Sequence, residues 1–172
     1  HAPSHDAEHP LFSLYTSGTT GLPKAARIPH SRARTYMRAF AGCTGSTETD
    51  RIFNCLPLYH STGGLVGVGP ALLNGGRLVL RKKFSASSFW PDVKSSGATM
   101  FVYIGELCRY LLGQPVRPQE REHNLRMIMG NGLRPEIWKE FQERFNIPRV
   151  CEFYAASESP VAFVNAFSVD ST

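Results

Sequence analysis

The 172-residue chain has no apolar run that approaches the length of a membrane-spanning helix. Such a helix requires about 18 consecutive apolar residues, so the sequence does not predict one. Cysteine is also scarce, and the four cysteines, at positions 43, 55, 108 and 151, form no C-x-x-C pair. Disulfide frameworks and zinc sites depend on such regular spacing, so neither is expected. Because Cys55 and Cys151 stand in apolar runs, we interpret them as buried, reduced thiols.

Charge of one sign is equally limited. The formal net charge is +5, and the basic residues are dispersed along the chain. The densest cluster, Arg81-Lys82-Lys83, is too short to indicate nucleic-acid binding, and we interpret it as the solvated end of a strand. No nucleic-acid partner is therefore expected. An anionic substrate and an acidic membrane surface both stay open as partners.

The common phosphate-binding motif of nucleotide hydrolases is missing as well. A P-loop of the form G-x-x-x-x-G-K-[ST] that began at Gly18 would need glycine at position 23 and serine or threonine at position 25. The chain has Pro23 and Ala25 at these positions. Proline has no N–H group to offer a phosphate. The sequence therefore argues against a P-loop ATPase or GTPase.

A different Gly-rich stretch is present at residues 15–24, which read Y-T-S-G-T-T-G-L-P-K after a short apolar run. Glycine lets the backbone approach a ligand closely, and successive N–H groups in such a turn bind anions. Hydroxyls and a cation complete a possible polyphosphate cradle. Its members are Thr16, Ser17, Gly18, Thr19, Thr20, Gly21 and Lys24. The alternative is an ordinary Ser/Gly-rich connection between two strands.

Strand-like and helix-like segments alternate along the chain, which favours an α/β fold with a largely parallel sheet. We expect strands over residues 11–15, 24–28, 51–56, 77–80, 99–104, 125–129 and 150–154. We expect helices over residues 30–41, 63–73, 106–112 and 135–145. A further helix should carry Phe89, Trp90 and Val93 and be capped by Ser85 or Ser87.

Two segments look irregular. Residues 114–122 contain two prolines and four charges, which predicts an exposed loop. Residues 1–10 contain three regularly spaced histidines, but their prolines and polar residues argue against a stable helix. We interpret residues 1–10 as a loose N-terminal tail rather than a metal site. Residues 11–172 then form one domain.

Three further clusters follow predicted strands, at residues 56–64, 130–134 and 152–158. Open α/β sheets bind ligands at the carboxyl ends of their strands. The first cluster contains His60, which taken alone is best interpreted as a turn residue that caps a helix. The second contains Asn131, whose amide can read the edge of a base. The third offers aromatic rings for stacking on adenine and a carboxylate for Mg²⁺.

Together, and in this order, the motifs resemble those of adenylate-forming enzymes, which carry Y-T-S-G-T-T-G-x-P-K, P-L-x-H and Y-G-x-T-E segments. The counterparts here are residues 15–24, 57–60 and 154–158. Longer strings resemble a narrower group, the fatty-acid transport protein and very-long-chain acyl-CoA synthetase family, in its bacterial-like branch. These strings occupy residues 56–60, 81–87, 103–112 and 130–134. The resemblance covers nearly all of residues 11–165.

The resemblance implies that residues 11–172 are part of an AMP-binding (adenylation) domain, the central part of a larger N-terminal domain with a mostly parallel sheet and flanking helices. It implies a long-chain or very-long-chain fatty acid–CoA ligase that uses ATP, Mg²⁺ and coenzyme A. Two alternatives stay open: a fatty-acid importer that acts by vectorial acylation, and a CoA ligase for another acid such as a bile acid or a carnitine-like compound. The expected location is the cytoplasm or the cytoplasmic face of the membrane.

The resemblance also assigns roles to single positions. His60, Lys24 and Glu158 would serve catalysis, and Thr16 and Glu158 would hold Mg²⁺. The nucleotide would contact residues 16–21, Lys24, Asn131, Gly132, Leu133, Tyr154 and Ser157, with Tyr154 stacked on adenine. Ala155 and Ser157 depart from the usual glycine and threonine of the third motif. The family's downstream ribose-binding aspartate and C-terminal lysine are not in this chain, so we expect it to be inactive alone.

Overall fold

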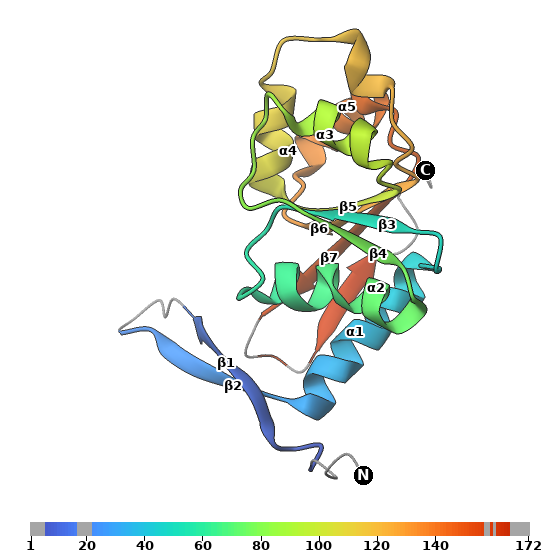
Figure 1. Cartoon of the computed structure of the whole chain (residues 1–172). Coiled ribbons are helices and arrows are strands. Elements are labelled where there is room, and N and C mark those ends of the chain that lie inside the picture. Colours follow the sequence, from blue (N-terminus) through green and yellow to red (C-terminus); the bar gives the residue numbers. More distant parts are fainter. Residues whose placement is uncertain (1–5, 17–21, 157–158, 160, 166–172) are drawn as a thin grey trace.

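The computed structural model describes residues 6–16, 22–156, 159 and 161–165 (Figure 1). Its strands are β1 (Pro10–Thr16), β2 (Lys24–Pro29), β3 (Arg51–Asn54), β4 (Arg77–Leu80), β5 (Met100–Ile104), β6 (Met127–Asn131), β7 (Val150–Ala155) and β8 (Ala162–Asn165). Its helices are α1 (His30–Thr44), α2 (Gly69–Asn74), α3 (Phe89–Ser96), α4 (Gly105–Leu112) and α5 (Pro135–Phe145). A π-helix, η1 (Thr62–Gly67), and a 3₁₀ turn, η2 (Pro118–Arg121), complete the described elements.

The main sheet has six strands in the order β4-β3-β5-β6-β7-β8. The first five are parallel to one another, and β8 is antiparallel to β7. Helices α1 and α2 cover one face, and α3, α4 and α5 cover the other (Figure 1). This arrangement confirms the expected α/β fold with a mostly parallel sheet. It also aligns the carboxyl ends of β3, β5, β6 and β7 along one edge.

The central strands are apolar along their whole length because helices cover both faces of the sheet. The side chains of 100–103 in β5 and 127–129 in β6 are essentially inaccessible to solvent. Rings pack around them in edge-to-face pairs, as in Phe89 against Phe101 at 4.7 Å. Three cysteines in this region, Cys55, Cys108 and Cys151, are buried and free, and burial had been expected for Cys55 and Cys151.

The hairpin of β1 and β2 forms a separate two-stranded sheet. It packs through a small apolar cluster in which Leu14 and Ile28 meet Leu65 of η1. Residues just before the hairpin contact the start of α1, because the carbonyls of Ala7 and His9 accept the N–H groups of residues 31 and 30 at 2.8 and 3.1 Å. These two bonds satisfy donors that a helix N-terminus otherwise leaves open.

Several local expectations were wrong. The N-cap of α3 is Ser88, not Ser85 or Ser87, and its side chain makes no capping bond. The single helix expected over residues 63–73 is divided into η1 and α2, because the tight turn before it brings the backbone of Pro57 against Gly63. A Cβ at Gly63 would collide with the Pro57 carbonyl oxygen. The edge strand β8 was not expected at all.

The segment 114–122, expected to be an exposed loop, contains one deeply buried carboxylate. Glu120 is only 3% exposed and pairs with Arg144 at 3.0 Å. The same guanidinium donates to the carbonyls of Leu112 and Gln114 at 2.6 and 2.7 Å. A buried charge is tolerated only when it is paired and hydrogen-bonded. This pair therefore fastens the segment to α5.

A neutral histidine lies just beyond this segment. His123 accepts the Leu125 N–H at its Nδ1 atom, 3.1 Å away, and donates from Nε2 to the Phe145 carbonyl at 2.9 Å. Its ring stacks on Trp90 with the centroids 5.0 Å apart. Burial lowers the pKa of His123 below its usual value. Protonation would cost the bond from Leu125, since both nitrogens would then be donors.

No helix among the described residues is long and apolar enough to cross a bilayer.

Candidate functional site

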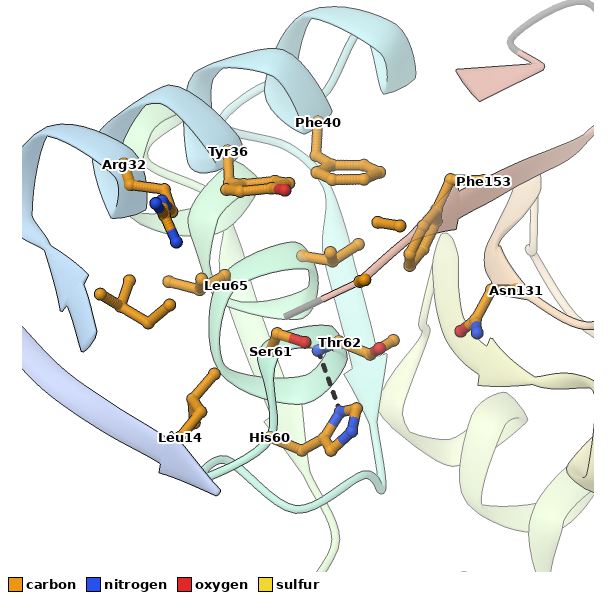
Figure 2. Close-up of a pocket in the computed structure, with 14 residues that line it drawn as sticks. Leu14, Arg32, Tyr36, Phe40, His60, Ser61, Thr62, Leu65, Asn131 and Phe153 are labelled. Carbon is orange, nitrogen blue, oxygen red and sulfur yellow. Dashed lines mark hydrogen bonds between the residues drawn. The ribbon is translucent and has the colours of Figure 1, made fainter. Parts of the chain in front are cut away.

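A cavity of about 260 Å³ opens at the carboxyl edge of the sheet (Figure 2). Its walls come from the hairpin, α1, the turn before η1, and the ends of β6 and β7. The lining combines apolar side chains with polar ones, which come from Arg32, Tyr36, His60, Ser61, Thr62 and Asn131. Two of the residues singled out from the sequence, His60 and Asn131, thus face one cavity although different strands carry them.

The turn that carries His60 is held from below by a buried amide. Asn54, at the end of β3, is fully buried, and its Nδ2 donates to the Gly63 carbonyl at 2.9 Å. Its Oδ1 accepts the Leu56 N–H at 3.1 Å. One side chain therefore connects both sides of the turn. The sequence analysis did not single out Asn54.

The ring of His60 has a defined hydrogen-bonding state. The Thr62 N–H donates to His60 Nδ1 at 3.3 Å (Figure 2), so His60 bonds the first residue of η1 although the N-cap of that helix is Ser61. An Nδ1 that accepts a hydrogen bond leaves the proton of the neutral ring on Nε2. His60 therefore offers an N–H donor at the wall of the cavity. Capping and ligand binding are compatible roles here, since they use different nitrogens.

Asn131 ends β6 and presents an unusual polar atom. Its Oδ1 is buried and has no hydrogen-bond partner among the described residues. Buried acceptors without partners are uncommon, and at a cavity wall they indicate a place for a donor from a ligand or water. Gly130 makes this position possible, because a Cβ there would collide with the carbonyl oxygen of Tyr103 on β5. The backbones of β5 and β6 therefore approach each other closely next to the site.

A carboxylate organises the turn that follows Asn131. Glu152 of β7 accepts the N–H groups of Gly132 and, at 3.2 Å, of Leu133. It also accepts the hydroxyl of Tyr103, a fully buried residue of β5. Gly132 has φ +83°, a conformation that favours glycine. Burial raises the pKa of Glu152, and its hydrogen bonds oppose that rise. A single side chain thus joins the ends of β5, β6 and β7.

The Gly-rich stretch has a defined base. Thr16 and Lys24 are register partners across the hairpin, and Thr16 Oγ1 donates to the Lys24 carbonyl at 3.4 Å. Neither lines the cavity, whereas Leu14 and Ile28 of the same hairpin do. Ser17, Gly18, Thr19, Thr20 and Gly21 lie outside the described residues. Their assignment to phosphate binding stays a prediction.

The third cluster divides between the two faces of β7. Phe153 points to the cavity and packs edge-to-face on Phe40 of α1 at 4.8 Å. Tyr154 points the other way, because strand side chains alternate, and it is 77% exposed opposite Phe163. The structure therefore does not bring Tyr154 into the cavity with Asn131. Its role in stacking on adenine stays a prediction.

The metal assignment rests on residues of which little is described. Ser157 and Glu158 lie outside the described residues, and the adjoining Ser159 accepts the Tyr36 hydroxyl at 2.7 Å. This bond ties the segment that carries the predicted metal ligand to α1. Among the described positions, no group of three or more His, Cys, Asp or Glu side chains could hold a metal ion.

Sequence reasoning missed the contribution of α1. Arg32, Tyr36 and Phe40 stand four residues apart on one side of the helix, and all three line the cavity (Figure 2). The sequence predicted a helix over residues 30–41 but assigned no role at the site to these three residues. The sequence did contain a signal for this. Arg32, Tyr36 and Phe40 follow one another at four-residue spacing, so a cation interrupts an otherwise apolar helix face.

The sequence matches known proteins along nearly its whole length. The family model described as AMP-binding enzyme matches residues 1–172. The chain is 50% identical to the medium/long-chain-fatty-acid–CoA ligase FadD6 of Mycobacterium tuberculosis over 96% of its own length and 28% of the relative's. It is 52% identical to the long-chain fatty acid transport protein 1 of Homo sapiens over 95% of its own length and 25% of the relative's.

Among solved structures, the chain resembles a malonyl-CoA ligase ternary product complex with methylmalonyl-CoA and AMP bound. The TM-score is 0.79 at 28% identity, and the match covers 89% of this chain and 34% of that one. The chain spans about a quarter of the length of the curated relatives described above.

Proposed function

Because the chain belongs to the AMP-binding enzyme family, we propose that it supplies the nucleotide-binding core of a fatty acid–CoA ligase. The favoured substrates are long-chain and very-long-chain acids. The observation that carries the proposal is the cavity at the carboxyl edge of the sheet, where His60 and Asn131 meet apolar walls. Similarity to a fatty acid–CoA ligase and to a fatty acid transport protein supports the choice of substrate.

The reaction has two steps. A carboxylate oxygen attacks the α-phosphorus of ATP, so that an acyl-adenylate forms and pyrophosphate leaves. The thiol of coenzyme A, after losing its proton, then attacks the acyl carbon, and AMP leaves. Neither step needs a strong general acid from the protein. Positioning of the reactants and neutralisation of phosphate charge are the main contributions expected from the site.

Features of the described residues support binding of a nucleotide. The unpartnered Oδ1 of Asn131 can accept the exocyclic amino group of adenine, which would remove the penalty of a buried open acceptor. The turn at Gly132 and Leu133 would lie along the base and is held in place by Glu152. The Gly-rich stretch that starts at Thr16 would enclose the outer phosphates, with Lys24 at its base.

His60 would act at the reacting centre. Its Nε2–H can donate to an oxygen of the substrate carboxylate or of the α-phosphate, while the bond from Thr62 holds the ring in orientation. Mg²⁺, bound near Thr16 and Glu158, would neutralise phosphate charge. The chain's own part is to place oxygen ligands at those two positions.

Fatty-acid-dependent ATP–pyrophosphate exchange tests the proposal. We expect exchange with the full-length protein and none with residues 1–172 alone, because the relatives are about four times as long. The acids tested should range from medium to very long chains and include a short dicarboxylic acid, a bile acid and a carnitine-like compound. Absence of exchange with fatty acids, with the fold intact, would refute the proposed substrate class.

A second candidate is a fatty-acid importer that works by vectorial acylation, favoured by the likeness to a protein named as a fatty acid transporter. In that case the protein would act at the cytoplasmic face of a membrane rather than free in the cytoplasm. Membrane fractionation, combined with uptake of labelled fatty acid by cells with and without the gene, separates the two. Uptake that persists in an exchange-deficient variant would argue against coupling by acylation.

A further inference from the structure

The cavity contains one charged side chain that the proposed reaction has not used. Arg32 is half-buried in the first turn of α1 and lines the cavity beside Leu14 and Leu65 (Figure 2). It makes no hydrogen bond or ion pair with any residue in the described part of the chain. The hydroxyl of Tyr36, one turn further along α1, is close enough to feel its charge and is itself uncharged at neutral pH.

The position of Arg32 does not stabilise the folded protein. The N-terminus of a helix carries a partial positive charge, so a cation in the first turn is unfavourable there. No acidic residue accompanies Arg32 in that turn. Partial burial adds a desolvation cost, and none of the residues that the structure describes compensates it with a hydrogen bond or an ion pair. The backbone donors of residues 30 and 31 are already bonded to the tail, so the helix end itself is not the binding group.

We propose that Arg32 binds the carboxylate of the acid substrate and so selects acids over neutral lipids. This rests on the proposed function. A guanidinium offers a planar pair of donors that matches a carboxylate in a bidentate arrangement. The apolar walls beside it, from Leu14, Ile28 and Leu65, suit the alkyl chain that follows the carboxylate.

The position of Arg32 favours a carboxylate over a phosphate of ATP. The predicted phosphate stretch emerges between Thr16 and Lys24, and neither of these lines the cavity. Asn131, the residue proposed for the base, lies on the opposite side of the cavity, on the sheet (Figure 2). The cation therefore faces a part of the cavity that neither Asn131 nor the described ends of the Gly-rich stretch occupy.

The test uses the full-length protein with Arg32→Gln, Arg32→Lys and, as a matched control, Arg38→Gln. Arg38 is on the same helix, exposed, and outside the cavity. Loss of a charge-assisted bidentate contact should raise the KM for fatty acid about 10- to 100-fold in Arg32→Gln. The KM for ATP should stay within about 2-fold, Arg32→Lys should restore part of the loss, and Arg38→Gln should match the wild type.

A direct binding measurement tests the Arg32 proposal independently of whether the protein catalyses the proposed reaction. Calorimetric titration with a fatty acid and with the fatty alcohol of equal length should show a preference for the acid that disappears in Arg32→Gln. Loss of acid binding without any exchange in the wild type would support the carboxylate site and refute the ligase. A raised KM for ATP with unchanged acid binding, or no change in either, would overturn the proposal. Circular dichroism confirms that each variant is folded.

Discussion

Replacing Glu152 should disturb the turn at Gly132 and Leu133, which is proposed to lie along adenine, more than the rest of the fold. Its carboxylate accepts three hydrogen bonds, from Gly132, Leu133 and Tyr103, which lie on or just beyond β5 and β6. Alanine would remove all three acceptors. The change therefore tests whether one side chain on β7 determines the position of a turn that follows a different strand.

The expected magnitude follows from the exposure of each donor. Tyr103 is fully buried, so its hydroxyl would lose its partner without access to water, at about 2 kcal/mol. Gly132 is exposed and the bond from the Leu133 amide is only partly buried, so each lost bond there costs about 1 kcal/mol. The sum for Glu152→Ala is about 4 kcal/mol. Glu152→Gln retains a carbonyl acceptor for both amides and should cost about 1 kcal/mol.

Urea denaturation of the full-length protein, with ATP kinetics on the folded variants, measures both effects. Glu152→Gln should raise the KM for ATP only slightly, whereas Glu152→Ala should raise it about tenfold or more because the turn is no longer held. Glu140→Ala, at an exposed glutamate of α5, is the control and should change stability by less than about 0.5 kcal/mol. If Glu152→Ala is as stable as Glu140→Ala, the reasoning from unsatisfied donors is wrong.

Three further predictions concern other parts of the molecule. Burial holds the pKa of His123 below its unfolded value near 6.5. The contribution of His123 to the free energy of unfolding is therefore complete above pH 6.5 and is lost as the pH falls, by up to about 1.4 kcal/mol per pH unit. Urea titrations at pH 7.5 and 5.5 should show this loss in the wild type and a smaller loss in His123→Gln. Tyr36→Phe removes the 2.7 Å bond to the Ser159 carbonyl and should cost about 1 kcal/mol while slowing pyrophosphate exchange. Gly130→Ala should prevent folding or cost several kcal/mol. The Cβ added by Gly42→Ala in α1 meets no atom within 4 Å, so this change should stabilise the protein by about 0.5–1 kcal/mol. Thermal denaturation distinguishes the two variants.

Each of these has a result that contradicts it. An equal pH dependence in the wild type and the His123 variant would assign the acid sensitivity to carboxylates. Exchange by the Tyr36 variant at the wild-type rate would show that the tether to Ser159 has no part in the reaction. A folded Gly130→Ala protein with unchanged stability would mean that β5 and β6 separate at their ends more easily than their packing indicates.

Much of the architecture was readable from local sequence patterns. The expected boundaries of α5 agree with the structure, because Pro135 starts the helix and Asn146 ends it in a left-handed conformation. Continuous apolar runs identified β5 and β6 as buried parallel strands. One error arose because several serines before α3 carry the same capping signal. Another arose where Gly63 and Gly64 pack closely against the backbone of Pro57 and Leu58, and η1 forms in place of an α-helix.

The candidate site was only partly predictable. His60 and Asn131 were singled out because polar residues followed apolar strands, and the structure places both at one cavity. Arg32 was not singled out, and Glu152 was included in the third cluster without a role of its own, since a lone charge in an amphipathic helix or strand resembles an ordinary surface residue. Tyr154 was assigned to adenine, yet the alternation of β7 directs Phe153 to the cavity and leaves Tyr154 exposed.

The sequence by itself determined the class of fold, the order of its strands and helices, and the motifs that indicate nucleotide chemistry. These depend on hydrophobic periodicity, glycine and proline, which act over a few residues. Only the tertiary structure decided which side chains meet. Tyr36 contacts Ser159 across 123 residues, and Glu152 reaches the turn after a neighbouring strand. Such contacts depend on parallel strand order and on which face each side chain occupies, and no local pattern encodes either.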